Sequence, residues 1–228
     1  MSKVFVFCIG GTGIRVMKSI TMLMASGMST NGYDVVPIYW DPHLDLGERK
    51  NLISLLDQYK DIYDKSINNG NAILNPLNGF FNSKIITVDQ LIGNVNNGRN
   101  NVGSNTDFRS YIQLSNIANN DINNHLVDTL FSTKNLNNQL DVGFKGNPNV
   151  GTVVLGDMIE NENWYRAFQQ SCATGDRIFI ISSIFGGTGA SGFPLLEKKI
   201  RLAKNYPAVQ GALMGAVTVL PYYGLEDP

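Results

Sequence analysis

The chain has 228 residues, of which 43% are hydrophobic and 16% are charged. This composition can bury a sizeable core as one large domain or two small ones, and it excludes an intrinsically disordered chain. The formal net charge of -1 provides no general attraction to nucleic acid or to an anionic membrane. We therefore expect neither as a partner, and any anionic ligand must be held by local groups.

The two cysteines and the N-terminus give no sign of an extracellular protein. Cys8 and Cys172 lie far apart and outside any metal-type spacing, so the sequence predicts neither a disulfide framework nor a zinc site. The N-terminal run KVFVFCIG is short and lacks a cleavage pattern, and no stretch approaches the roughly 20 apolar residues of a membrane span. We expect a cytoplasmic protein.

The first third of the chain alternates strand and helix patterns. Lys3–Ile9 is a dense apolar run that predicts a strand buried on both faces. Residues 14–27 have apolar side chains at helical spacing and end at a glycine, which predicts a helix. Tyr33–Pro42 is typical of a second strand, and Pro37 within it favours an edge position.

Residues of about 66–139 form a region crowded with asparagine, as in NVNNGRNNVGSN and IANNDINNHL. Asparagine favours turns and helix caps over element interiors, so we expect loops and short helices here. We interpret this region as a surface insertion in one domain that spans residues 1–228.

The last third returns to regular alternation. Residues 152–175 predict a helix, 176–184 an apolar strand, 193–206 a second helix and 212–224 a last buried strand. Strand, turn and helix alternating in this way predict an α/β fold of the Rossmann-like, three-layer type, with helices on both faces of a parallel sheet.

Two copies of the string GGTG, at residues 10–13 and 186–189, stand where a predicted strand passes into a predicted helix. Ligands bind at this end of the strands in open parallel sheets, and a helix N-terminus attracts phosphate through its unpaired N–H groups. Tight packing is an equally good explanation of one such turn, whereas two at equivalent strand ends favour phosphate binding.

Two common nucleotide motifs are absent or incomplete. No Walker A string occurs, and the motif that starts at Gly11 has Val16 where a dinucleotide fingerprint has its third glycine. The motif that starts at Gly187 keeps that spacing through Gly192, but it follows a late strand and lacks the expected acidic residue. An NAD(P)-binding oxidoreductase domain therefore remains an alternative.

Four segments together resemble one known family. FGGTGASGFP resembles the glycine-rich signature of the tubulin/FtsZ superfamily, CIGGTGIRV takes the place of its first phosphate loop, YWDP is similar to a tubulin segment with an acid before proline, and GFKGNPNVG resembles the FtsZ loop GAGANPEVG. These segments occur along the chain in the same order as in the family. The chain thus resembles the N-terminal nucleotide-binding part of a bacterial tubulin-like GTPase.

The resemblance implies GTP or GDP with Mg²⁺ as cofactors and assigns roles by position. Around the α- and β-phosphates it implies Gly10, Gly11, Thr12 and Gly13. Around the diphosphate it implies Gly186, Gly187, Thr188 and Gly189, with Ala190 and Ser191 at the helix entrance. Near a γ-phosphate it implies Gly146 and Asn147, and for magnesium, through water, Asp41.

The chain also departs from the family. Ile14 stands where the family has a base-contacting asparagine, and Ser191 replaces the last glycine of the signature. The family's base-reading loop, central helix, catalytic acidic loop and C-terminal domain have no counterpart, so we expect a piece of a longer protein with weak or no GTP hydrolysis. The resemblance implies head-to-tail self-association in full length; the other alternative is a tubulin-like scaffold that no longer binds nucleotide.

Overall fold

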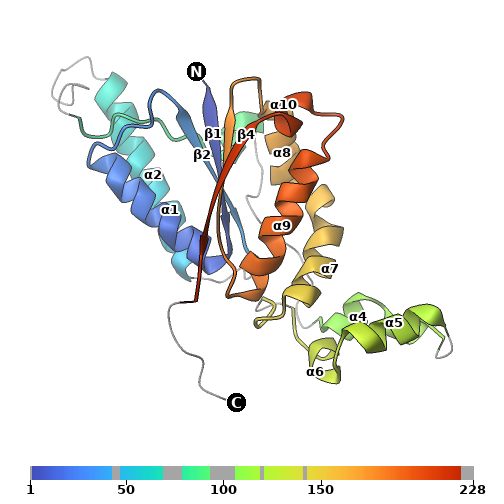
Figure 1. The fold of residues 1–228 in the computed structure, drawn as a ribbon. Helices are drawn as coiled ribbons and strands as arrows, with labels where there is room; N and C mark the ends of the chain where they lie inside the picture. Colours follow the sequence, from blue (N-terminus) through green and yellow to red (C-terminus); the bar gives the residue numbers. More distant parts are fainter. Residues whose placement is uncertain are drawn as a thin grey trace.

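The computed structural model describes residues 2–42, 47–68, 79–92, 106–118, 121–140 and 143–221. Their centre is a parallel sheet of four strands in the order β2-β1-β3-β4 (Figure 1). The strands are β1 (Lys3–Ile9), β2 (Asp34–Trp40), β3 (Arg177–Ser183) and β4 (Leu213–Val219). The predicted α/β class with a parallel sheet is confirmed.

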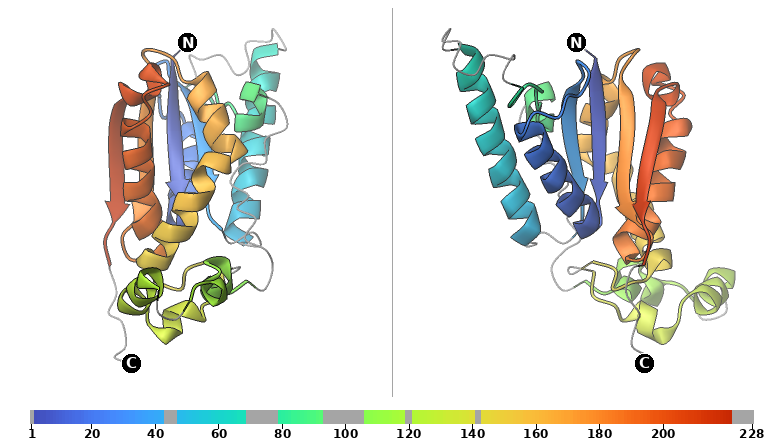
Figure 2. Two further views of the ribbon diagram at one scale, coloured as in Figure 1. Left: turned by 90° about the vertical axis from the view of Figure 1, so that its right-hand side faces the viewer. Right: turned by 60° about the vertical axis from the view of Figure 1, so that its left-hand side comes forward.

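Helices cover both faces of the sheet, which makes three layers (Figures 1 and 2). One face carries α1 (Gly10–Ala25) and α2 (Gly47–Asn68); the other carries α7 (Pro148–Met158), α8 (Asn163–Ser171) and α9 (Gly187–Arg201). The connection from β1 runs to one side of the sheet and the connection from β3 to the other. Because such crossovers are right-handed, their helices fall on opposite faces.

The core divides along the two faces of β1. Phe5 and Phe7 pack edge-to-face on Phe168 of α8, with ring centroids 5.0 and 4.9 Å apart. Cys8 points to the other face, in a cluster with Met17 of α1. Burial raises the pKa of the Cys8 thiol far above its ordinary range, which makes it unreactive. The prediction of a strand buried on both faces is confirmed.

The helix predicted over residues 152–175 is wrong as a single element. Helix α7 ends at Met158, a 3₁₀ turn (η4, Ile159–Asn161) follows, and Glu162 is extended at φ -74° and ψ 124° before α8 begins. The carboxylate side chain of Glu162 is buried at this break, with the residue only 7% exposed. The change of direction places Trp164 and Phe168 against β1.

The last strand is present, but the prediction that it is buried is wrong. β4 is an edge strand of the described sheet, and Leu213 and Val217 are 70% and 43% exposed. Helix α1 packs mainly on β1 and β3. The other outer strand is β2, so the edge position that Pro37 favoured is confirmed.

The described part of the Asn-rich region consists of short helices, as expected. They are α3 (Val88–Ile92), α4 (Phe108–Tyr111), η3 (Leu114–Asn116), α5 (Ile122–Leu130) and α6 (Thr133–Leu136). Figure 2 shows α4 to α6 beyond the carboxyl ends of the strands. Residues 69–78, 93–105 and 119–120 of the predicted insertion lie outside the described residues. Within the described chain, no helix combines the length and apolar character that a membrane span requires.

Candidate functional site

Both GGTG strings form the first turn of a helix. Helix α1 begins at Gly10, directly after β1, and α9 begins at Gly187, whereas the sequence predicted helices from residues 14 and 193. Gly10 has φ +70°, a left-handed conformation that lets the chain turn from strand to helix within one residue. The first N–H groups of each helix, which have no intrahelical partner, therefore belong to these glycine-rich turns.

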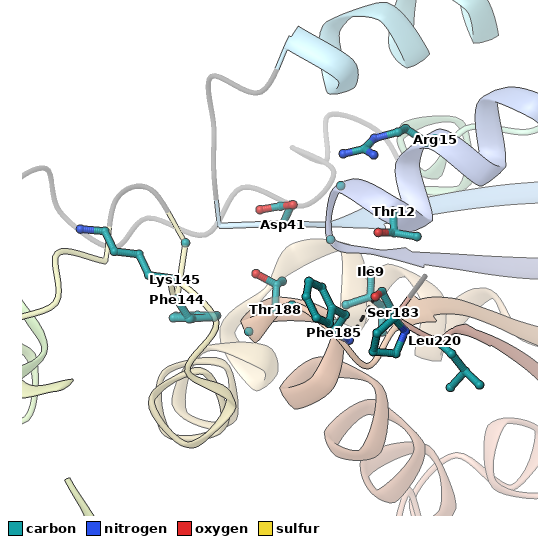
Figure 3. Close-up of a pocket in the computed structure, with 17 residues that line it drawn as sticks. Ile9, Thr12, Arg15, Asp41, Phe144, Lys145, Ser183, Phe185, Thr188 and Leu220 are labelled. Carbon is teal, nitrogen blue, oxygen red and sulfur yellow. Dashed lines mark hydrogen bonds between the residues drawn. The ribbon is translucent and has the colours of Figure 1, made fainter. Parts of the chain in front are cut away.

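The two glycine-rich turns meet a third segment around a pocket of about 310 Å³ (Figure 3). The third segment, residues 143–145, precedes α7. A Cβ on Gly10 would lie 3.7 Å from Thr188 Cβ, and a Cβ on Gly143 would lie 3.9 Å from Thr188 Oγ1. Because β1 and β3 are neighbours in the sheet, segments far apart in the sequence reach the same pocket.

Packing explains some of these glycines and leaves one unexplained. A Cβ on Gly13 would lie 2.7 Å from the carbonyl carbon of Cys8, and one on Gly189 would lie 2.2 Å from the Ser183 carbonyl oxygen. Gly186 differs: nothing lies within 4 Å of its Cβ position, and its φ of -99° suits any residue. It lines the pocket, so the space beside it is open to a ligand.

Three helices present uncapped N-termini in this region. The residues before α1, α7 and α9 make no side-chain hydrogen bond to the helix, and none of the three helices has an acidic residue in its first turn. Helices α1 and α9 contribute their first residues directly to the pocket lining. Backbone N–H groups and the positive ends of the helix dipoles therefore favour an anion here.

The pocket lining includes two cations that the sequence interpretation did not assign to the site. Arg15 is 60% exposed at its side chain, with Nε 3.8 Å from Glu48 Oε1, and it lines the pocket. Lys145, the last residue of the third segment, has φ 46° and lines the pocket. In the sequence, Lys145 stands in the string GFKG, and these nearby glycines are the one feature that could have assigned it to the site. Arg15 strengthens the attraction of the pocket for a negatively charged group, whereas the Lys145 side chain extends away from Asp41 and Thr188 in Figure 3.

Asp41 is the carboxylate of this lining. It follows the last residue of β2, is 6% exposed and lies in Figure 3 between α1 and Thr188. No group of three metal-ligating side chains occurs in the part of the chain that the structure describes. Magnesium is commonly held by one or two carboxylates together with phosphates and water, so Asp41 fits a metal that arrives with a phosphate ligand.

Some of the predicted site residues line the pocket, and others lie outside its lining. Among the lining residues are Gly10, Gly11, Thr12, Asp41, Gly186, Gly187, Thr188 and Gly189. The predicted residues outside the lining are Gly13, Gly146, Asn147, Ala190 and Ser191. The Ser191 hydroxyl donates to the Gly187 carbonyl at 2.6 Å within α9, and the Asn147 side chain accepts from Asn135 at 2.7 Å. The Ser191 bond lies within the first turns of α9, and the Asn147 bond joins the residue before α7 to α6.

The structure also adds to the lining Ile9, the last residue of β1, and four further residues: Ser183, Phe185, Leu220 and Pro221. Ser183 Oγ accepts a hydrogen bond from the Phe185 N–H at 3.1 Å, which shapes the turn before α9. No sequence signal distinguished these four residues, because their role depends on where the turn and the end of β4 lie.

No protein-family model matches the chain, and no curated protein sequence matches it significantly. The function must therefore be argued from the fold and from the geometry of the pocket.

Proposed function

We propose that this chain is a nucleotide-binding domain of the tubulin/FtsZ type that holds the polyphosphate of GTP or GDP. The observation that supports it most is that the first turns of the uncapped helices α1 and α9 meet residues 143–145 around one pocket. Backbone donors at helix starts bind phosphate without a Walker lysine. Open space beside Gly186 allows the phosphates to approach the main chain.

The side chains of the pocket complete the proposed site. The hydroxyls of Thr12 and Thr188 add donors, and Arg15 offsets the negative charge of the phosphates. Asp41 is the proposed magnesium ligand. The bound Mg²⁺ would neutralise charge on the phosphate oxygens. In this arrangement the described residues bind the nucleotide and position its phosphates. We therefore expect weak GTP hydrolysis or none.

One contact favours a second candidate, an NAD(P)-binding oxidoreductase domain. A Cβ on Gly192 would lie 2.8 Å from Ile9 Cγ2, so α9 packs closely on the strand. Close helix–strand packing is the role of the third glycine in a dinucleotide fingerprint. A scaffold that binds no nucleotide is the remaining alternative.

A titration with fluorescent GTP, GDP, ATP and NAD, with and without Mg²⁺, separates these candidates. We expect guanine-selective binding in the micromolar range that weakens when magnesium is removed. Selective NAD binding would support the oxidoreductase, and no binding would support the scaffold.

Thr188→Arg tests the position of the site. The arginine side chain would fill the space beside Gly10 and Gly143, so we expect loss of nucleotide binding with an unchanged circular dichroism spectrum. Thr129→Arg, on exposed helix α5, is the matched control and should bind as the wild type does. Unchanged affinity in Thr188→Arg would refute the proposed site.

A further inference from the structure

A second hollow, of about 800 Å³, lies between α8 and the C-terminal end of α9. Figure 1 shows these elements at the amino ends of the strands, at the opposite end of the molecule from the glycine-rich turns. We call it the α8–α9 groove. Its lining residues are Glu160, Tyr165, Arg166, Gln169, Gln170, Leu195, Lys198, Lys199, Leu202, Ala203, Lys204, Asn205 and Tyr206.

The groove has an apolar part that is firmly built. Tyr165 is only 3% exposed and its ring packs against Trp164, with centroids 5.7 Å apart. Leu202, which follows the last residue of α9, is 58% exposed. Tyr165 forms the closed floor of the groove, and the apolar area open to a partner comes from Leu202 and from the partly exposed Leu195 and Tyr206.

The charges of the groove are strongly unbalanced. Four cations, Arg166, Lys198, Lys199 and Lys204, face one acid, Glu160. Lys199 forms an ion pair with Glu160. Among the described residues, Lys198 and Lys204 form no ion pair. The groove is therefore positive in a chain whose formal net charge is -1.

The helix dipole explains only part of this charge. Lys198 and Lys199 lie in the last turn of α9, where cations are favourable in any helix. Arg166 lies on α8, and Lys204 lies beyond the end of α9. Because these two cations line the same groove, the groove is complementary in charge to an acidic partner.

We propose that the α8–α9 groove docks an acidic, amphipathic protein segment, a function separate from the proposed nucleotide site. Apolar side chains of the segment pack on Leu202, Leu195 and Tyr206. Its carboxylates pair with Lys198 and Lys204. A helix with one apolar and one acidic face has this chemistry. Nucleic acid fits less well, because the chain as a whole lacks the positive charge that draws a polyanion.

The probe is a fluorescein-labelled amphipathic peptide of leucine and glutamate, beside a twin peptide with glutamine in place of glutamate. Fluorescence anisotropy should show salt-sensitive binding of the glutamate peptide alone. The double variant Lys198→Glu/Lys204→Glu should weaken binding by about tenfold or more, because two attractive pairs become repulsive. Leu202→Ala should weaken it by about fivefold through lost apolar contact.

The control is the double variant Lys18→Glu/Lys134→Glu, which makes the same change of charge on α1 and α6, outside the groove. It should bind the peptide as the wild type does. Circular dichroism checks the fold of each variant, and Leu202→Ala tests the groove without changing its charge.

Three results would overturn the proposal: equal binding of the glutamine twin, equal losses in the two double variants, or no loss in Leu202→Ala. A short single-stranded RNA is titrated in parallel. Tighter RNA binding that depends on Lys198 and Lys204 would assign the groove to nucleic acid instead.

Discussion

A substitution at Gly186 tests nucleotide binding with less disturbance of the fold than a substitution at the other glycines of the pocket. Its Cβ position is open and its backbone conformation suits any residue, so Gly186→Ala should fold normally and gain about 0.4–1 kcal/mol in the free energy of unfolding. The added methyl group should hold phosphate away from the main chain and lower nucleotide affinity by about tenfold, the loss expected for one good hydrogen bond. Nucleotide titration and urea unfolding measure the two effects.

Gly47→Ala is the matched control. Gly47 also has open space at its Cβ position, but it begins α2 and does not line the pocket. Its nucleotide affinity should equal that of the wild type. If Gly186→Ala behaves in the same way, the ligand does not approach this part of the main chain.

Glu162 makes stability depend on pH. Burial raises its pKa from the ordinary 4.5 to about 7, and the charge of Arg49 opposes this in part. Between these two values the folded chain holds a proton that the unfolded chain releases, so the free energy of unfolding falls as pH rises. The fall should be on the order of 2 kcal/mol between about pH 5 and pH 8.

Glu162→Gln removes the titrating group and should reduce this slope in urea unfolding measured across the same pH range. Glu197→Gln, on partly exposed α9, should keep the slope of the wild type. Identical slopes in Glu162→Gln and the wild type would show that another group causes the pH dependence.

Helices α7 and α9 pack against each other through small residues. Substituting alanine at two glycines of α7 should change the free energy of unfolding in opposite directions. A Cβ on Gly151 would lie 2.4 Å from Ser191 Oγ and 2.8 Å from Phe144 Cδ2. Gly151→Ala should therefore lower the free energy of unfolding by about 1–3 kcal/mol, and it should weaken nucleotide binding by displacing Phe144, which lines the pocket.

Gly156→Ala is the partner variant in the same helix. Its Cβ would meet Leu195 Cδ1 at 3.9 Å, an ordinary contact, so it should gain about 0.5–1 kcal/mol from helix propensity. Thermal and urea unfolding compare the two. A gain in both variants would show that α7 and α9 can separate at little cost.

Elements with strong local signals could be predicted from the sequence. The apolar run Lys3–Ile9 coincides with β1, and both GGTG strings lie at strand ends as expected. The break at Glu162 could not be predicted, because it depends on burying a carboxylate against tertiary neighbours. Arg15 could not be assigned to the site from the sequence either, because its spacing is that of any solvent-exposed helix residue. It lies at the pocket because β1 and β3 are neighbours in the sheet.

At the scale of the whole molecule, β4 is an apolar edge without charge protection. Residues 212–220 contain no charged side chain, and Leu213, Val217 and Leu220 are 43–70% exposed. Natural edge strands commonly carry charges that block pairing with other chains. Val217→Lys should therefore reduce concentration-dependent association, as measured by light scattering. Ile122→Lys replaces an even more exposed residue on α5 and should leave association unchanged; an equal effect would exclude the edge as its cause.

The order of the strands also sets when the proposed site can form during synthesis. Gly10 is synthesised long before the residues that face it, Thr188 and Gly189. Long-range parallel pairing forms slowly. A nascent polypeptide thus cannot form the proposed site until β3 has paired with β1 and α9 has begun, so the proposed ligand can act on folding only after these elements have been made.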